Sequence, residues 1–93
     1  MQDLFKRHYE ATVKRGQIRK DTKTIDFIMK MAEEDNEVLR EMITYSVGMP
    51  PSEELVSEVI DKAMVCFNFL QHIGVDIELA LCRNTMKQES RKD

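Results

Sequence analysis

Gly48-Met49-Pro50-Pro51 interrupts a long run of helical pattern near the middle of this 93-residue chain. Proline lacks the backbone N–H that a helix interior needs, so the first helix of the pair should end near Val47. Ser52 follows as a candidate N-cap, with Glu53 and Glu54 in the first turn of the next helix. Because a connection this short places consecutive helices side by side, the segment predicts an antiparallel helical pair.

Apolar residues recur at three- and four-residue steps on both sides of this break, which is typical of amphipathic helices. We expect four helices, at about 2–14, 24–47, 53–73 and 77–86. Gly16 and Gly74 are candidate stops, and Thr22 or Thr24 and Asp76 are candidate caps. The apolar arc of the second helix is expected to hold Ile28, Met31, Ala32, Val38, Leu39, Met42 and Ile43.

The predicted fold class is therefore all-α, a four-helix antiparallel bundle in a single domain of residues 1–93 with a polar tail from about residue 87. Hydrophobic residues make up 42% of the chain and charged residues 33%, as in folded proteins. A chain this short buries only about 60–65% of its unfolded surface, so we expect a homo-oligomer to complete the bundle. Cys66 and Cys82 lie in apolar pattern and are expected to be reduced core residues.

Charge and hydropathy limit the classes of partner. The sequence shows no signal peptide and no apolar segment long enough to cross a bilayer, so we expect a cytoplasmic protein without a membrane partner. The net charge is −3 and no nucleic-acid-binding module is present, which argues against a nucleic-acid partner. Residues 26–61 are acidic between basic ends. This pattern suits either a metal cluster beside phosphate-binding groups or ordinary solvated helix faces.

Two acidic motifs lie on the two central helices. Glu34 and Glu37 share one stripe of the second helix, and Glu58 and Asp61 share one stripe of the third. Asp61 stands inside an apolar run, so we expect it to be buried and to need a cation, a hydrogen-bond network or a raised pKa. Asp35, near the middle of the apolar arc, either pairs with a basic residue of another helix or marks a difference in packing.

Antiparallel packing would bring these four carboxylates around one small volume. Hard oxygen ligands suit Mg²⁺, with Mn²⁺ as a substitute, rather than zinc. Such a site would orient a water for attack on phosphorus and neutralise charge on a departing pyrophosphate. Either motif alone is more often a solvated helix face, and it is their occurrence on consecutive helices that points to metal.

Glu34-x-x-Glu37 followed by Glu58-x-x-Asp61 resembles the signature of the all-α MazG-like nucleotide pyrophosphohydrolases. Residues 72–81 are similar to the family's turn into its last helix, and Lys14-Arg15-Gly16 is similar to small members. The resemblance implies hydrolysis of a nucleoside triphosphate to the monophosphate and pyrophosphate, with Mg²⁺ held by the four acidic residues. It also implies a homodimer or tetramer. Residues expected to bind substrate are Asn68, Asn84, Lys87 and Arg91.

One alternative function remains open at this stage. The chain would be a non-catalytic helical interaction protein that keeps the fold, if the departures from the family pattern at Asn84 and Gln88 remove phosphate binding. His8 lies on the apolar stripe of the first helix, where a packed, hydrogen-bonded histidine is more common than a catalytic one. The aromatic residues Phe5, Tyr9, Phe67 and Phe69 are expected to pack in the core rather than stack on a base.

Overall fold

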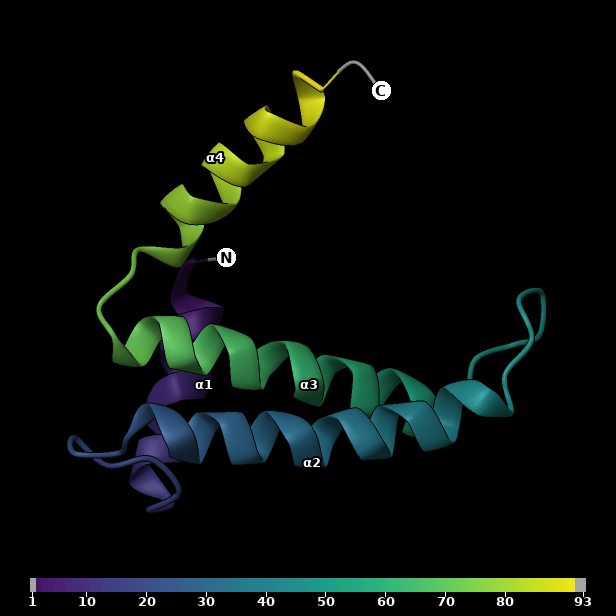
Figure 1. Ribbon diagram of the computed structural model, residues 1–93, viewed down its shortest axis with the longest axis horizontal. Helices are drawn as coiled ribbons and strands as arrows, with labels where there is room; N and C mark the ends of the chain where they lie inside the picture. Colours follow the sequence, from purple (N-terminus) through teal and green to yellow (C-terminus); the bar gives the residue numbers. More distant parts are fainter. Residues whose placement is uncertain (1, 92–93) are drawn as a thin grey trace.

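The computed structural model describes residues 2–91, with side chains from Leu4 onward, and within this range the chain forms four helices and no strand (Figure 1). The helices are α1 (Gln2–Lys14), α2 (Thr24–Ile43), α3 (Glu53–His72) and α4 (Ile77–Glu89). The all-α prediction is therefore confirmed. Of the predicted polar tail, Lys92 and Asp93 lie outside the described residues.

The predicted stops and two of the predicted caps are confirmed. Gly16 and Gly74 take positive φ angles of 78° and 84°, which a side chain would strain. Ser52 Oγ accepts a hydrogen bond from the Leu55 N–H at 3.0 Å, and Asp76 Oδ1 accepts one from the Leu79 N–H at 3.1 Å. Each bond satisfies a backbone donor that a helix start leaves without a partner.

The prediction for the ends of α2 was wrong in two respects. The N-cap is Lys23, whose backbone N–H donates to Asp26 Oδ2 at 2.9 Å, while the hydroxyl of Thr22 accepts from the Arg19 N–H at 2.7 Å within the preceding turn. The helix ends at Ile43 rather than near Val47. Thr44 Oγ1 donates to the Glu41 carbonyl at 3.2 Å, and a hydroxyl that binds a main-chain carbonyl competes with helix continuation.

The hairpin of α2 and α3 is the centre of the molecule. The two helices run antiparallel and side by side, while α1 packs across α3 and contacts α4 (Figure 1). The chain then turns through 115° between α3 and α4, so α4 points away from the hairpin. Antiparallel packing is thus present for α2 and α3 within one chain, and completion of a bundle by a second copy stays a prediction.

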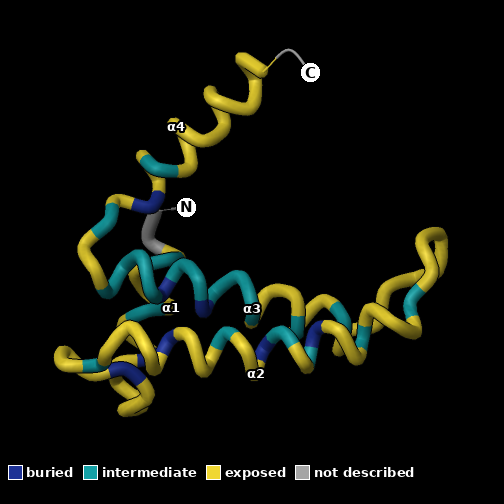
Figure 2. The backbone as a smooth tube through the Cα atoms, in the orientation of Figure 1, coloured by how far each residue is buried: buried dark blue, intermediate teal, exposed yellow. Residues whose placement is uncertain are grey.

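Few side chains of the described range are fully enclosed (Figure 2). The buried apolar residues are Ile18, Phe27, Val38, Val65 and Ile77. On α2 the buried positions are Phe27, Glu34 and Val38, which are spaced as one helical stripe. The predicted arc lies largely beside this stripe, because Leu39 and Ile43 are 55% and 78% exposed. Cys82 is also exposed, contrary to prediction, because α4 leaves the core.

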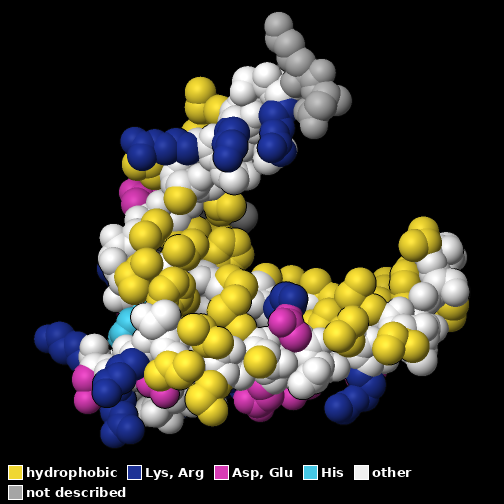
Figure 3. All heavy atoms as spheres, in the orientation of Figure 1, with side chains coloured by type: hydrophobic (Ala, Val, Ile, Leu, Met, Phe, Trp, Pro, Cys, Tyr) yellow, Lys and Arg dark blue, Asp and Glu magenta, His cyan; other side chains and the backbone are white. Residues whose placement is uncertain are grey.

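The isolated chain exposes more surface than a compact monomer does. Its accessible surface is 7641 Å², whereas a folded chain of 10.9 kDa exposes about 5,600 Å². Its radius of gyration is 15.3 Å, against about 12 Å for a compact domain of this length. Apolar side chains cover the junction of α3 and α4 and follow the hairpin (Figure 3). Of the four helices described, none alone has the length and apolar character to cross a membrane. Only α3 and α4 taken together, as a bent pair, have that length and apolar character.

Candidate metal centre and the adjoining cleft

Three of the four predicted metal ligands meet between α2 and α3. Glu34, Glu37 and Glu58 each offer a carboxylate oxygen, and these oxygens all lie within 4.8 Å of one another. The first two residues are one helical turn apart on α2, and the antiparallel arrangement of α3 brings the third opposite them. We refer to these three residues as the acidic cluster.

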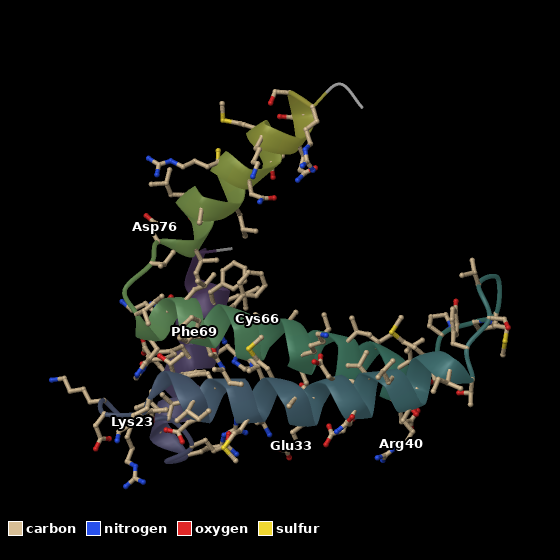
Figure 4. The ribbon with its side chains drawn as sticks, viewed as in Figure 1. Lys23, Glu33, Arg40, Cys66, Phe69 and Asp76 are labelled. Atoms are coloured by element: carbon tan, nitrogen blue, oxygen red, sulfur yellow. The ribbon has the colours of Figure 1, made fainter. Side chains whose placement is uncertain are left out.

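Glu34 is the most enclosed member of the acidic cluster, with 5% of its surface exposed. Its Oε1 lies 3.4 Å from Lys30 Nζ, but its Oε2 is buried without a hydrogen-bond partner. Burial raises the pKa of this carboxyl above its ordinary value, the hydrogen bond from Lys30 opposes that rise, and the charge of Glu37 adds to it. The neighbouring Glu33 instead lies on the side of α2 that faces away from α3 (Figure 4).

Glu58 is half-buried on α3, and its Oε2 is likewise enclosed without a partner. Its pKa is raised, first by a side-chain hydrogen bond with Glu37, then by burial and by the charges of Glu37, Asp61 and Glu34. Two carboxylates can share a hydrogen bond only when one of them is protonated. The raised pKa of Glu58 means that this carboxyl holds a proton more tightly than an isolated one does.

The acidic cluster has the donor set of a site for a hard divalent cation. Its ligands are carboxylate oxygens, which Mg²⁺ and Mn²⁺ prefer. The oxygens lie within 4.8 Å of one another, and opposite ligands of an octahedral Mg²⁺ are about 4.2 Å apart, so the side chains would close slightly around an ion. One buried oxygen each of Glu34 and Glu58 has no hydrogen-bond partner, and a bound cation would compensate such an oxygen. The residues present therefore fit the predicted ion.

Asp61, the fourth predicted ligand, was expected to be buried and is exposed. It lies at the edge of the α2–α3 contact rather than inside it, since the apolar residues beside it, such as Ile60, are themselves 54% exposed. Its charge still contributes to the raised pKa of Glu34 and of Glu58. Its role as a ligand remains a prediction, because it borders the acidic cluster without belonging to it.

A cleft of about 680 Å³ opens beside the acidic cluster, between α1, the 16–22 loop, α2 and α3. Glu34 and Asp61 line it, so the cluster and the cleft share a carboxylate. Its other polar and charged lining residues are His8, Thr12, Arg15, Gln17, Thr22, Asp26, Lys30, Glu33 and Asn68. Its apolar lining residues are Ile18, Phe27, Met29, Met64 and Val65. The carboxylates of this lining would attract a cation, and the remaining walls are mixed polar and apolar.

Asn68 is the predicted substrate-binding residue that the structure places in the cleft. It is buried, with 5% of its surface exposed, and its amide joins α3 to α1. Its Oδ1 lies 3.3 Å from His8 Nδ1, and its Nδ2 donates to Thr12 Oγ1 at 3.5 Å. His8 is thus hydrogen-bonded, as expected, but its ring lies at the cleft surface rather than in the core.

A second polar link holds the loop that lines the cleft. His72 Nε2 lies 2.9 Å from the Thr22 carbonyl oxygen, and its Nδ1 lies 2.8 Å from the Tyr9 hydroxyl. Because a carbonyl oxygen only accepts, Nε2 is the donor to Thr22. Phe27 packs against both His72 and Phe69, at centroid distances of 5.2 and 5.3 Å. The 16–22 loop is thereby fixed to the end of α3.

The other predicted substrate-binding residues lie on α4 or just after it, and so elsewhere in the single chain. Asn84, Lys87 and Arg91 are exposed, and none of them lines the cleft. Figure 3 shows the Lys and Arg side chains of α4 gathered on a helix that points away from the hairpin. Any role for them in this chain's own cleft remains a prediction.

Asp35 pairs with Lys62 across α2 and α3, which is one of the two outcomes that the sequence allowed. Both side chains are about half exposed, and Asp35 raises the pKa of Lys62 through a hydrogen bond and its charge. Lys62 lies one turn after Glu58 on α3 but does not line the cleft. The pair therefore links the two helices that carry the acidic cluster.

Two basic residues of the cleft were not predicted to bind substrate within one chain. Arg15 lines the cleft and donates from Nη2 to Gln17 Oε1 at 3.3 Å, and Lys30 lines it beside Glu34. A sequence signal was present for Lys30, which stands four residues before Glu34 and so on the same helix face.

Comparison of the chain with family models, curated proteins and solved structures finds no match.

Proposed function

We propose that this chain is a divalent-metal-dependent hydrolase that converts a nucleoside triphosphate to the monophosphate and pyrophosphate. The observation that carries the proposal is the buried Oε2 of Glu34, which has no hydrogen-bond partner and lies in a cluster with Glu37 and Glu58. A carboxylate in that position is costly unless a cation or a proton compensates it. The sequence motifs that resemble the MazG-like family add the reaction type.

The acidic cluster would hold Mg²⁺, and the ion would supply charge neutralisation on the phosphates and a water of lowered pKa. Asp61 lines the cleft within electrostatic range of Glu34 and Glu58, which supports a role for it in orienting water or metal. Asn68, held between His8 and Thr12, presents a fixed amide to the cleft. One of the carboxylates would accept the proton of the attacking water.

Turnover with Mg²⁺ is the direct test. The common NTPs and dNTPs are incubated with the protein, and release of pyrophosphate is measured with and without EDTA. We expect Glu58→Gln to lower kcat/KM about 100- to 1,000-fold, because it removes a ligand from the acidic cluster. Glu54→Gln is the matched control, since Glu54 lies one turn earlier on α3, is exposed and is outside the cluster.

Two results would contradict the proposal or part of it. If no triphosphate is consumed with Mg²⁺ or Mn²⁺, the activity is wrong. If Asp61→Asn is as active as the wild type, the assignment of Asp61 is wrong while the acidic cluster stands.

We also propose that the protein acts as a homodimer or tetramer. The single chain exposes about 2,000 Å² more surface than a compact monomer of its mass, which exceeds the about 800 Å² that each partner buries in a standard interface. An apolar groove of about 710 Å³ between α1 and α3, lined by Leu4, Phe5, Ile60 and Met64, adds to the uncovered surface. Sedimentation at rising concentration checks this, and a chain that stays monomeric at high concentration would contradict it.

A non-catalytic interaction protein is the alternative, and the exposed apolar surface and the position of α4 are the observations that favour it. Under this alternative the acidic cluster is only a solvated helix edge. Mg²⁺ would then leave the midpoint of thermal unfolding unchanged, whereas the proposed hydrolase is expected to be stabilised by the ion.

A further inference from the structure

The cleft contains a lysine ammonium group whose position a bound metal ion would change. Lys30 lies on α2 one turn before Glu34, lines the cleft, and has a side chain that is 49% exposed. Its Nζ lies 3.4 Å from Glu34 Oε1 and 3.8 Å from Glu33 Oε1. The ammonium group therefore sits where the acidic cluster meets the cleft, against the most buried carboxylate of the cluster.

In the metal-free chain Lys30 partly compensates the charge of Glu34, since its Nζ lies 3.4 Å from Glu34 Oε1. A divalent cation held by Glu34, Glu37 and Glu58 would compensate that charge more fully and would repel an ammonium group a few ångströms away. The lysine stem is flexible and its head is half exposed, so the head can turn into the cleft at small cost.

The same cleft is where a triphosphate would bring anionic oxygens close to the metal. Lysine binds phosphate as a point charge, and a hydrogen bond between two ionised groups is about twice as strong as a neutral one. The α4 residues expected to bind phosphate do not reach this cleft in the single chain, whereas Lys30 already lines it. The ammonium group of Lys30 would thus become available to a phosphate when the metal binds.

We infer that Lys30 is a phosphate-binding residue. When a divalent cation occupies the acidic cluster, the ammonium group of Lys30 moves from Glu34 to the phosphates of the substrate. This inference rests on the proposed function, because it needs both the metal and the phosphorylated substrate. Lys30 is therefore assigned two successive partners, the carboxylate in the free chain and the phosphate in the loaded one. Removal of the Lys30 charge should therefore strengthen metal binding and weaken phosphate binding.

Two binding measurements on the variants Lys30→Gln and Lys30→Arg test this. Mn²⁺ alone is titrated by the loss of its free paramagnetic signal, and inorganic tripolyphosphate is titrated by calorimetry with Mg²⁺ in excess. We expect Lys30→Gln to bind Mn²⁺ up to about fivefold more tightly, since a competing exposed cation is gone. The same variant should bind tripolyphosphate about tenfold more weakly. Lys30→Arg, which keeps the charge, should retain tripolyphosphate affinity within about threefold.

Lys62→Gln is the matched control. Lys62 also pairs with a carboxylate between α2 and α3 and has a similarly exposed side chain, 45% against 49%, but it does not line the cleft. We expect it to leave both affinities at the wild-type values. An equal loss of tripolyphosphate binding in Lys62→Gln would overturn the inference, because net charge rather than position would then be responsible.

The remaining outcomes separate this inference from the proposed function. If Lys30→Gln binds tripolyphosphate as tightly as the wild type while Mn²⁺ binding is intact, the inference is overturned and the metal site stands. If the wild-type chain binds no Mn²⁺, the metal-dependent function and the role of Lys30 are both overturned.

Discussion

The α2–α3 hairpin and α4 are built from similar local signals but reach different ends. Both α3 and α4 begin with a side-chain cap, Ser52 and Asp76, and both follow a short connection. The hairpin encloses a carboxylate and brings three acidic groups together, whereas every residue of α4 from Leu81 onward is exposed (Figure 2). Helix formation is thus a local property, while burial depends on what the rest of the chain places opposite the helix.

The predicted site residues of the hairpin and those of α4 also differ in their surroundings. The predicted residues of the hairpin, Glu34, Glu37, Glu58 and Asn68, are brought into one region together with Asp61 at its edge. The predicted residues of α4 share no cleft with them. If a second copy completes the molecule, it is α4 and the exposed arc of α2 that should change their surroundings.

Replacement of Phe27 by alanine is expected to give the largest difference in stability. Phe27 is 5% exposed and packs against Phe69 and His72, so Phe27→Ala should lower the free energy of unfolding by about 3–5 kcal/mol. Met86 on α4 is 62% exposed, and Met86→Ala should change it by less than about 0.5 kcal/mol. Urea unfolding measures both. Similar losses for the two variants would show that α4 is packed in solution.

The effect of metal on the acidic cluster is expected to be the next largest. An ion that binds only the folded chain at about 100 times its Kd should raise the free energy of unfolding by about 2.7 kcal/mol. Thermal or urea unfolding in Mn²⁺ against EDTA measures the change. The effect should be lost in Glu34→Gln and kept in Glu33→Gln, because Glu33 lies outside the cluster. Equal stabilisation of both variants would place the ion elsewhere.

The pH dependence of the metal-free chain follows from the raised pKa values of Glu34 and Glu58. The folded chain holds these protons more tightly than the unfolded chain, where the ordinary pKa is 4.5. The stability that these groups contribute is therefore fully present below that pKa and is lost as pH rises through the raised values. Urea midpoints in EDTA at about pH 5 and about pH 7.5 should show a smaller fall in Glu34→Gln than in the wild type. An equal fall would assign the dependence to other groups.

Sequence periodicity located the helices well because their signals are local. The stops at Gly16 and Gly74 and the caps at Ser52 and Asp76 depend on neighbouring backbone groups alone. Of the buried stripe of α2 only Val38 was in the predicted arc, because apolar residues surround much of that helix and only the contact with α3 selects Phe27, Glu34 and Val38. The sequence pattern around Ile60 suggested burial for Asp61, but no neighbouring helix covers that position in the single chain.

The acidic cluster could be predicted because its signals, like those of the caps and stops, are local in the sequence. The spacing of Glu34 and Glu37 places them on one face, and a short antiparallel connection fixes the helix opposite. Lys30 was harder to recognise, because a lysine four residues before a glutamate is a common surface pair, and its relation to a cleft depends on α1 and the 16–22 loop. Long-range packing therefore decides which local pairs become part of a site.

Removal of the two helix caps gives the smallest expected effect and the sharpest contrast between the regions. Ser52→Ala and Asp76→Ala each delete one hydrogen bond to a first-turn N–H, and such a loss costs about 1 kcal/mol where the helix is part of the cooperative fold. Because α3 belongs to the hairpin, Ser52→Ala should lower the unfolding free energy of the whole chain by about that amount. Because α4 is exposed along most of its length, Asp76→Ala should instead speed hydrogen exchange within α4 and leave exchange in α2 unchanged. If Asp76→Ala lowers the stability of α2 as much as Ser52→Ala does, then α4 folds as one unit with the hairpin, and its basic residues are held much closer to the acidic cluster than the single chain indicates.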